Sequence, residues 1–233
     1  MTETKVAIQN FYNKYNNPKD NIPKNERHVI LVNKLKDIGL NNNSNVLELG
    51  CGPGLITAMI SDTVKSGAII SSDISPERIA NAKAKNKQKN IQFFTSDIFD
   101  LQVPNIQFDF ITLFDVIEHI PIEKHLELFS YLSEIMTDNT QLLINIPNPL
   151  FIEYLKKNDP KLLQIIDQPI YADSIMKNAY SNELILDFFK TYGIWHEDDY
   201  QMMLFKKKKE FAKTKLPDTP KTIIQLFKNI FSK

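Results

Sequence analysis

The sequence predicts an α/β fold built on a doubly wound parallel sheet with helices on both faces. Between residues 45 and 146, short apolar runs alternate with longer segments of helical periodicity, the pattern of strands joined by crossover helices. Three of the chain's six glycines, Gly50, Gly52 and Gly54, follow the first apolar run directly. A strand, a glycine turn and a helix N-terminus form a place where a ligand can lie against bare backbone.

The segment before the first predicted strand is polar and has helical periodicity. Prolines at positions 18 and 23 interrupt it, and its second part, 26–38, gathers apolar residues on one helix face. Gly39 follows where a C-cap glycine is expected. We therefore predict an N-terminal helical cap over residues 1–44.

The middle of the chain contains the alternating elements. Ser75 before Pro76 is typical of a helix N-terminus, because serine caps the first turn and proline fits its first position. The predicted strands are 45–49, 68–72, 91–95, 109–113 and 141–146, and the predicted helices between them are 53–64, 76–87 and 122–136.

The alternation stops after the fifth predicted strand. Residues 147–181 are rich in proline and aromatic residues, and we interpret them as an insertion of short helices and loops within a core of 45–206. We then predict a helix at 182–191 and an antiparallel edge formed by strands at 194–196 and 200–205. The last segment, 207–233, is predicted as a basic linker and an amphipathic helix that packs on the domain, forms a homodimer or touches a membrane surface.

The composition excludes some classes of function. Lys plus Arg and Asp plus Glu number 28 each, so no cationic excess draws the chain to nucleic acid. Cys51 is the single cysteine, which excludes an internal disulfide. No apolar run approaches the roughly 18 residues that a spanning helix needs, and no signal peptide is visible. We expect a cytoplasmic protein without an integral membrane segment.

Acidic residues follow three of the predicted strands, at Asp73, Asp97 and Asp115. Ligands of doubly wound sheets bind outside the carboxyl ends of the strands, and Asp73 is placed to accept from both hydroxyls of a ribose. The glycine pattern G-x-G-x-G departs from the dinucleotide fingerprint G-x-G-x-x-G, and Glu48 would repel a pyrophosphate. The pattern favours a ligand with a positive charge, such as an ammonium or a sulfonium.

Two segments resemble the class I S-adenosylmethionine-dependent methyltransferases of the small-molecule branch. These segments are Val-Leu-Glu-Leu-Gly-Cys-Gly-Pro-Gly at 46–54 and Phe-Asp-Val-Ile-Glu-His-Ile at 114–120. The resemblance covers residues 40–150 in detail. It implies a Rossmann-like seven-stranded sheet with six parallel strands and an antiparallel last strand. It also implies S-adenosyl-L-methionine as cofactor and S-adenosyl-L-homocysteine as product.

The resemblance also implies which residues hold the cofactor. The glycines would let the methionine part approach the backbone, and Glu48 would orient loop amides or the amino group. Asp73 would hold the ribose and Asp97 the adenine amine. The expected cofactor-binding residues are Tyr12, Glu48, Gly50, Cys51, Gly52, Gly54, Asp73, Ile74, Ser96, Asp97, Ile98 and Phe114.

The candidate general base is His119, just past the fourth predicted strand. An oxygen acceptor needs a base to take its proton, and an imidazole suits this role near neutral pH. Tyr15, on the first predicted helix, would assist it. One alternative is a divalent metal held by Asp115, Glu118 and His119, in an O-methyltransferase of a quinone or other aromatic acceptor. Another is a non-catalytic protein that binds the cofactor.

The acceptor is expected to be a small polar molecule rather than a polymer. The chain lacks the N/D-P-P-Y/F run of amino-methylating nucleic-acid enzymes after the fourth predicted strand, and it has no basic stripe. The aromatic residues of the first helix and of the insertion 147–181 would wall the acceptor pocket. We therefore expect methylation of a hydroxyl of a sugar, in a precursor of a surface glycan or of a secondary metabolite.

Overall fold

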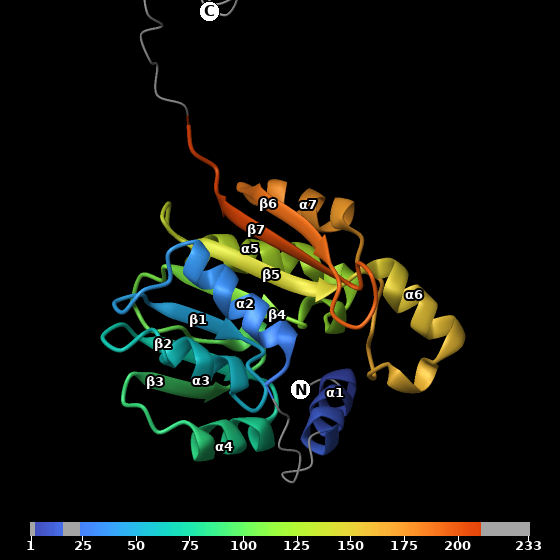
Figure 1. Ribbon diagram of the computed structural model, residues 1–233, viewed down its shortest axis with the longest axis horizontal. Helices are drawn as coiled ribbons and strands as arrows, with labels where there is room; N and C mark the ends of the chain where they lie inside the picture. Colours follow the sequence, from blue (N-terminus) through green and yellow to red (C-terminus); the bar gives the residue numbers. More distant parts are fainter. Residues whose placement is uncertain (1–2, 16–23, 211–233) are drawn as a thin grey trace, which may run out of the picture.

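The computed structural model describes residues 3–15 and 24–210, which form a seven-stranded sheet flanked by helices (Figure 1). The strand order is β3-β2-β1-β4-β5-β7-β6, and β7 runs in the opposite direction to the other six strands. The prediction of a sheet with six parallel strands and an antiparallel last strand is therefore confirmed.

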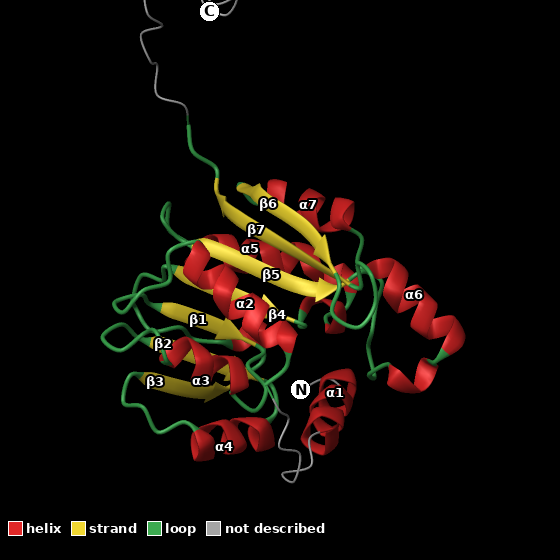
Figure 2. Ribbon diagram, viewed as in Figure 1, coloured by secondary structure: helices red, strands yellow, loops and turns green. Residues whose placement is uncertain are grey.

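The elements follow one another in the order that the alternating pattern predicts as far as β5 (Figure 2). The strands are β1 Val46–Leu49, β2 Ile69–Asp73, β3 Ile91–Thr95, β4 Phe110–Phe114, β5 Gln141–Pro147, β6 Leu184–Tyr192 and β7 Tyr200–Lys207. The α-helices are α1 Glu3–Tyr15, α2 Glu26–Asp37, α3 Leu55–Ser61, α4 Pro76–Lys85, α5 His125–Ile135, α6 Pro149–Asn158 and α7 Ala172–Tyr180.

The two faces of the sheet bury separate apolar clusters, because successive side chains of a strand point to opposite faces. On one face, Leu47 and Leu113 pack with residues of α5 and α7. On the other face, Val46 and Leu143 pack with residues of α2 and α3. Both clusters leave the carboxyl ends of the strands uncovered by core helices, and that edge is where α1 and α6 lie (Figure 1).

The predictions for the last part of the sheet are only partly right. The segment predicted as a helix at 182–191 is the edge strand β6, and the strand predicted at 194–196 is part of the loop that follows it. β6 pairs with β7 in an antiparallel hairpin with a bulge between Leu186 and Phe188. The pairing with β7 outweighs the weak helical pattern of this segment, as tertiary context commonly does. The antiparallel edge itself is confirmed.

Other predictions concern the insertion and the tail. Residues 147–181 contain α6, a short 3-10 turn at Pro160–Leu162 and α7, in agreement with short helices and loops. The amphipathic helix predicted within the last segment, 207–233, lies outside the described residues, which end at position 210. Among the helices of the described residues, none combines the length and apolar character needed to cross a bilayer.

Candidate functional site

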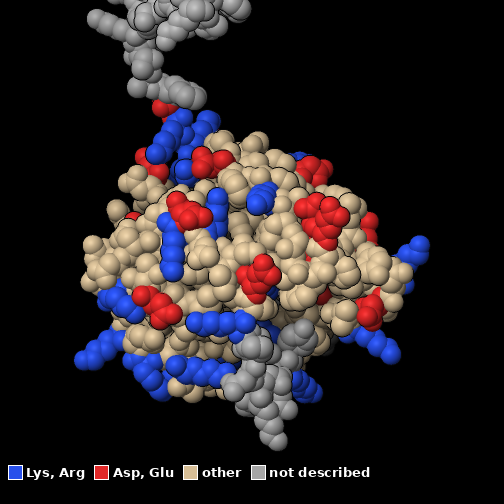
Figure 3. Space-filling model, in the orientation of Figure 1, with Lys and Arg blue, Asp and Glu red and all other residues tan. Residues whose placement is uncertain are grey.

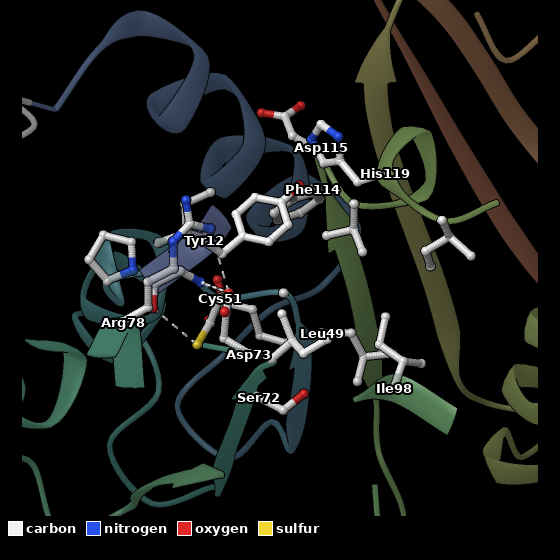
Figure 4. Close-up of a pocket in the computed structure, with 18 of the residues that line it drawn as sticks. Tyr12, Leu49, Cys51, Ser72, Asp73, Arg78, Ile98, Phe114, Asp115 and His119 are labelled. Atoms are coloured by element: carbon white, nitrogen blue, oxygen red, sulfur yellow. Dashed lines mark hydrogen bonds and ion pairs between the residues drawn. The ribbon is translucent and has the colours of Figure 1, made fainter. Parts of the chain in front are cut away.

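A cavity of about 340 Å³ opens at the carboxyl ends of β1, β2 and β4, beneath α1 (Figure 4). The side chain of Tyr12 lies in the middle of the view, between Arg78 and Phe114, and the Arg78 guanidinium carbon is 4.6 Å from the centre of the Tyr12 ring. The predicted site residues that line the cavity are Tyr12, Glu48, Gly50, Cys51, Gly52, Asp73, Ile74, Ser96, Asp97, Ile98, Phe114 and His119.

One predicted site residue whose surroundings are described, Gly54, does not line the cavity. Gly54 is the N-cap of α3 and has φ +77°, and a β-carbon there would lie 2.9 Å from the Ala82 β-carbon, so this glycine permits packing against α4. Tyr15 ends α1, and its side chain lies outside the described residues.

The glycine turn presents its backbone to the cavity. Gly50 and Gly52 have φ values of +75° and +54°, in the left-handed region that glycine adopts without a steric penalty. A β-carbon on Gly50 would lie 2.4 Å from Cγ2 of Val116, whereas one on Gly52 would meet only the tip of Arg78 at 4.0 Å. Gly50 is therefore required by packing, and Gly52 leaves open space on the side of the cavity.

Asp73 ties the glycine turn to the end of β2. Its carboxylate accepts hydrogen bonds from the backbone N–H of Gly52 and of Ser75, each at 2.9 Å. Burial raises its pKa, and the nearby Arg78 guanidinium, 3.9 Å away, opposes this shift. The side chain holds the turn in shape while it lines the cavity.

Glu48 is buried on β1 below the turn. Its Oε2 atom accepts hydrogen bonds from the hydroxyls of Thr57 and Ser71. Burial raises its pKa to about 7, although both hydroxyl donors favour the ionised form. Burial, with the charges of Glu48 and Asp73, also raises the pKa of the Cys51 thiol, which does not favour Cys51 as a nucleophile.

The opposite wall contains Arg27, which the sequence analysis missed. Its guanidinium forms an ion pair with Asp115, donates to the Tyr200 hydroxyl at 3.3 Å and stands over the Tyr200 ring. Asp115 has φ +55°, an uncommon conformation for a residue other than glycine. The chain has only two arginines, Arg27 and Arg78, and both line the cavity. The scarcity of arginine was the one feature of the sequence that could have pointed to Arg27 as a site residue.

His28 presents a hydrogen-bond donor beside Arg27. Its Nδ1 atom accepts from the backbone N–H of Asn25, so the proton of the neutral ring is on Nε2. Burial and the Arg27 charge lower its pKa to about 4, in keeping with a neutral ring. Nε2 lies 3.4 Å from Nη2 of Arg27, so two donors stand side by side with no acceptor between them. Both residues line the cavity.

His119 stands at the far end of the cavity, in the turn after β4. Its Nδ1 atom lies 2.5 Å from the carbonyl oxygen of Ile166 and 3.1 Å from Oδ1 of Asp167. Burial alone would lower the pKa of His119, but the carboxylates of Glu118 and Asp167 outweigh it and raise the pKa above the usual value. Asp167 belongs to the loop before α7. Because it is far from His119 in the sequence, their contact could not be predicted from local patterns.

Glu118 has no hydrogen-bond partner for either carboxylate oxygen, although it is fully buried. Its Oε1 atom is 3.8 Å from Nε2 of His119, and burial raises its pKa to about 7. The pattern Asp115, Glu118 and His119 does not form one cluster, because Asp115 pairs with Arg27. Across the described residues, no group of three or more His, Cys, Asp or Glu side chains is arranged to hold a metal ion.

Comparisons with known proteins agree with this geometry. A family model described as a methyltransferase domain matches residues 46–139. Trans-aconitate 2-methyltransferase of Escherichia coli is 31% identical over 182 residues, which are 76% of this chain and 69% of that protein. Malonyl-[acyl-carrier protein] O-methyltransferase of Bacillus anthracis is 32% identical over 83 residues, 36% of this chain and only 31% of that protein.

Solved structures show the same fold. The magnesium protoporphyrin IX methyltransferase from Synechocystis, solved with bound S-adenosylhomocysteine, superposes with a TM-score of 0.68 at 18% identity. The match covers 88% of this chain and 99% of that one. The fold and the site define a Rossmann-like methyltransferase domain. The chain belongs to the class I S-adenosylmethionine-dependent methyltransferases.

Proposed function

We propose that the chain transfers a methyl group from S-adenosyl-L-methionine to an oxygen atom of a small polar acceptor, a hydroxyl of a sugar or of a related glycan or secondary-metabolite precursor. The observation that carries this proposal is the cavity itself, with an open glycine turn at one end and the histidine His119 at the other. The cofactor supplies an electrophilic methyl group on a sulfonium, whose leaving group departs neutral.

The residues present fit the adenosine part of this cofactor. A β-carbon is missing at Gly52 where the cavity approaches the backbone, and Asp73 lies beside it with carboxylate oxygens that can each accept a further hydrogen bond. Asp73 would therefore hold the ribose hydroxyls. Ser96, Asp97 and Ile98 follow β3 on the same wall and would surround the adenine ring.

The paired donors of Arg27 and His28 fit the carboxylate of the methionine part. Two adjacent N–H donors line the cavity without an acceptor between them, and an anionic oxygen would satisfy both. Asp115 holds the Arg27 side chain through the ion pair and thereby fixes the direction of the remaining donors. Tyr12, from α1, would cover the cofactor.

His119 would act as the general base. Its Nδ1–H is held by Ile166 and Asp167, which leaves Nε2 of the neutral ring to accept the acceptor's proton. Nε2 of His119 would take the hydroxyl proton, and the bound cofactor would supply the methyl group, its carbon–sulfur bond breaking as the new carbon–oxygen bond forms. Asp167 would stabilise the resulting imidazolium. It is a positioning residue in this scheme. We still propose that the Tyr15 hydroxyl assists His119 in taking the proton.

A second candidate is methylation of a carboxylate. It is favoured by the names of two relatives, which act on trans-aconitate and on a malonyl group. It also fits the surroundings of His119, since acceptors face both ring nitrogens and would stabilise a permanent imidazolium. A carboxylate needs no base, because it is already deprotonated. The imidazolium would then attract the acceptor instead of taking its proton.

Transfer of a tritiated methyl group tests the proposal. The protein is incubated with labelled S-adenosyl-L-methionine and the small-molecule fraction of a cell extract, and His119→Asn serves as the variant. We expect label in a small molecule with the wild type, loss of transfer in the variant, and equal cofactor affinity by calorimetry. Cofactor binding without any transfer would instead indicate the non-catalytic alternative. A wild-type optimum on the acid side, with a raised KM and a nearly unchanged turnover number in His119→Asn, would support the carboxylate.

A further inference from the structure

Aromatic rings gather on the surface next to the candidate site. Phe151 and Tyr154 of α6 and Trp195 and His196 of the β6–β7 loop, here called the aromatic shelf, come from two separate segments. Phe151 stacks on Tyr154 with ring centres 6.3 Å apart, and the His196 ring lies 5.2 Å from Phe151. Trp195, the chain's only tryptophan, is 58% exposed, and Tyr154 is 52% exposed.

The backbone under the shelf is held firmly. Asp199 is buried, and its carboxylate accepts hydrogen bonds from three consecutive backbone N–H groups, of residues 194–196, at 2.8–3.1 Å. Its carbonyl oxygen accepts from the N–H of Asn148, the N-cap of α6, at 2.8 Å. These bonds fix the loop against α6. The backbone at Trp195 is therefore held in place although its ring buries little apolar area. This indicates that the ring serves a contact at the surface and not the stability of the core.

A chain of contacts joins the shelf to the cavity. The ring centre of Trp195 lies 5.8 Å from that of Tyr200, at the start of β7. Tyr200 in turn accepts a hydrogen bond from Arg27, which lines the cavity. The shelf therefore lies on the Arg27 side of the cavity.

Exposed carboxylates outnumber lysines around the shelf, although Lys156 and Lys157 of α6 are exposed as well. Glu197 and Asp198 are exposed in the same loop, and Glu153 is exposed on α6 beside Tyr154. Figure 3 shows acidic side chains on the right-hand side of the molecule, where Figure 1 draws α6, with lysines at the outer edge. Carboxylates accept hydrogen bonds from hydroxyls and repel anions. An aromatic surface with such a rim suits a ligand that has an apolar ring face and hydroxyl edges, and it opposes an anionic partner.

We infer that the aromatic shelf binds a neutral saccharide, a ring of the acceptor next to the part that receives the methyl group. The inference rests on the proposed function for its acceptor class, but binding to the shelf requires neither cofactor nor catalysis. Trp195 would stack on the ring, and the acidic rim would accept from its hydroxyls.

An array of neutral and anionic glycans tests the inference with the full chain, cofactor-free. The variants are Trp195→Ala and, as a matched control, Phe189→Ala, an aromatic residue 43% exposed on the edge strand β6. We expect binding to one or more neutral glycans, a loss of about tenfold or more in affinity for Trp195→Ala, and no change for Phe189→Ala. Titration with a bound glycan should also shift the fluorescence of the single tryptophan.

Three results would overturn the inference: no neutral glycan bound, a preference for anionic glycans, or equal affinity in Trp195→Ala and the wild type. Self-association that is lost in Trp195→Ala would identify the shelf as a contact between copies of the chain, and this too would contradict it. Unchanged cofactor affinity and His119-dependent transfer in Trp195→Ala would leave the proposed function intact. Conversely, if His119→Asn loses methyl transfer but still binds the glycan, glycan binding by the shelf does not depend on catalysis at His119.

Discussion

The two halves of the sheet's carboxyl edge are built differently. At the ends of β1, β2 and β3, the groups that line the cavity lie within a few residues of their strands, as in the glycine turn, Asp73 and Asp97. Around β4, β5 and β7, His119 follows its strand closely, but Arg27 comes from α2, and Asp167, which contacts His119, comes from the loop before α7. The first half exposes backbone and short carboxylates, and the second depends on contacts between side chains. The first half can therefore be inferred from local sequence.

The largest expected effect tests whether the first half depends on bare backbone. Gly50→Val should unfold the turn and abolish cofactor binding, because its β-carbon would clash with Val116 and its φ is positive. Gly52→Ala has room for its β-carbon, although its φ of +54° adds some backbone strain, and it should retain the fold at lower stability while losing cofactor affinity. Circular dichroism melts and calorimetric titration of the cofactor distinguish the two. Equal behaviour of the variants would contradict the different roles given to these glycines.

The next effect tests the side-chain contacts of the second half. His119→Ala should lower the turnover number by about 10²–10⁴-fold, the usual contribution of a general base. Because the pKa of His119 is raised, the wild-type rate should fall as the pH drops through a value above 6.5. Asp167→Asn removes one cause of that shift, so its rate should be lower and its acid limb should move to lower pH. A pH–rate profile unchanged in Asp167→Asn would refute the positioning role.

A smaller effect is expected on the pH dependence of stability, where the buried glutamates of the two halves, Glu48 and Glu118, can be compared. Glu48 and Glu118 both have a pKa raised to about 7 from 4.5, so the folded chain binds more protons than the unfolded one between these values. Each should make the free energy of unfolding fall by up to about 3 kcal/mol as the pH rises from 4.5 to 7. Glu48→Gln and Glu118→Gln should each flatten that decline in urea melts. Steeper dependence in either variant would show that the residue is ionised in the fold.

The smallest expected effect is on the free energy of unfolding and concerns Ser75, which follows β2 in the first half. Ser75 caps α4 by accepting from the N–H of Arg78, and its hydroxyl donates to Asn13 of α1 at 2.7 Å. Ser75→Ala should lower the free energy of unfolding by about 1 kcal/mol. Ser75→Asp, which keeps a capping oxygen, should recover part of it in the same denaturant series. Equal losses in both variants would mean that the contact with Asn13 is the larger contribution.

The sequence allowed prediction of β1 to β5, and most of the residues predicted for the site line the cavity. Their apolar runs are short and separated, and parallel topology brings the ends of successive strands together. β6 was predicted as a helix, because its pairing with β7 is set by contacts that no local pattern contains. Arg27 and Asp167 were missed for the same reason. Each contacts its partner across many residues, and neither belongs to a recognisable motif.

The reversed direction of β7 has a consequence for how such a protein can change. The strand begins, rather than ends, at the carboxyl edge, so the β6–β7 loop both starts and finishes there. Residues can be inserted or exchanged in that hairpin connection without altering any crossover helix or the glycine turn. Selection for a new acceptor could therefore change this loop while the ends of β1, β2 and β3, including the glycine turn, stay unchanged.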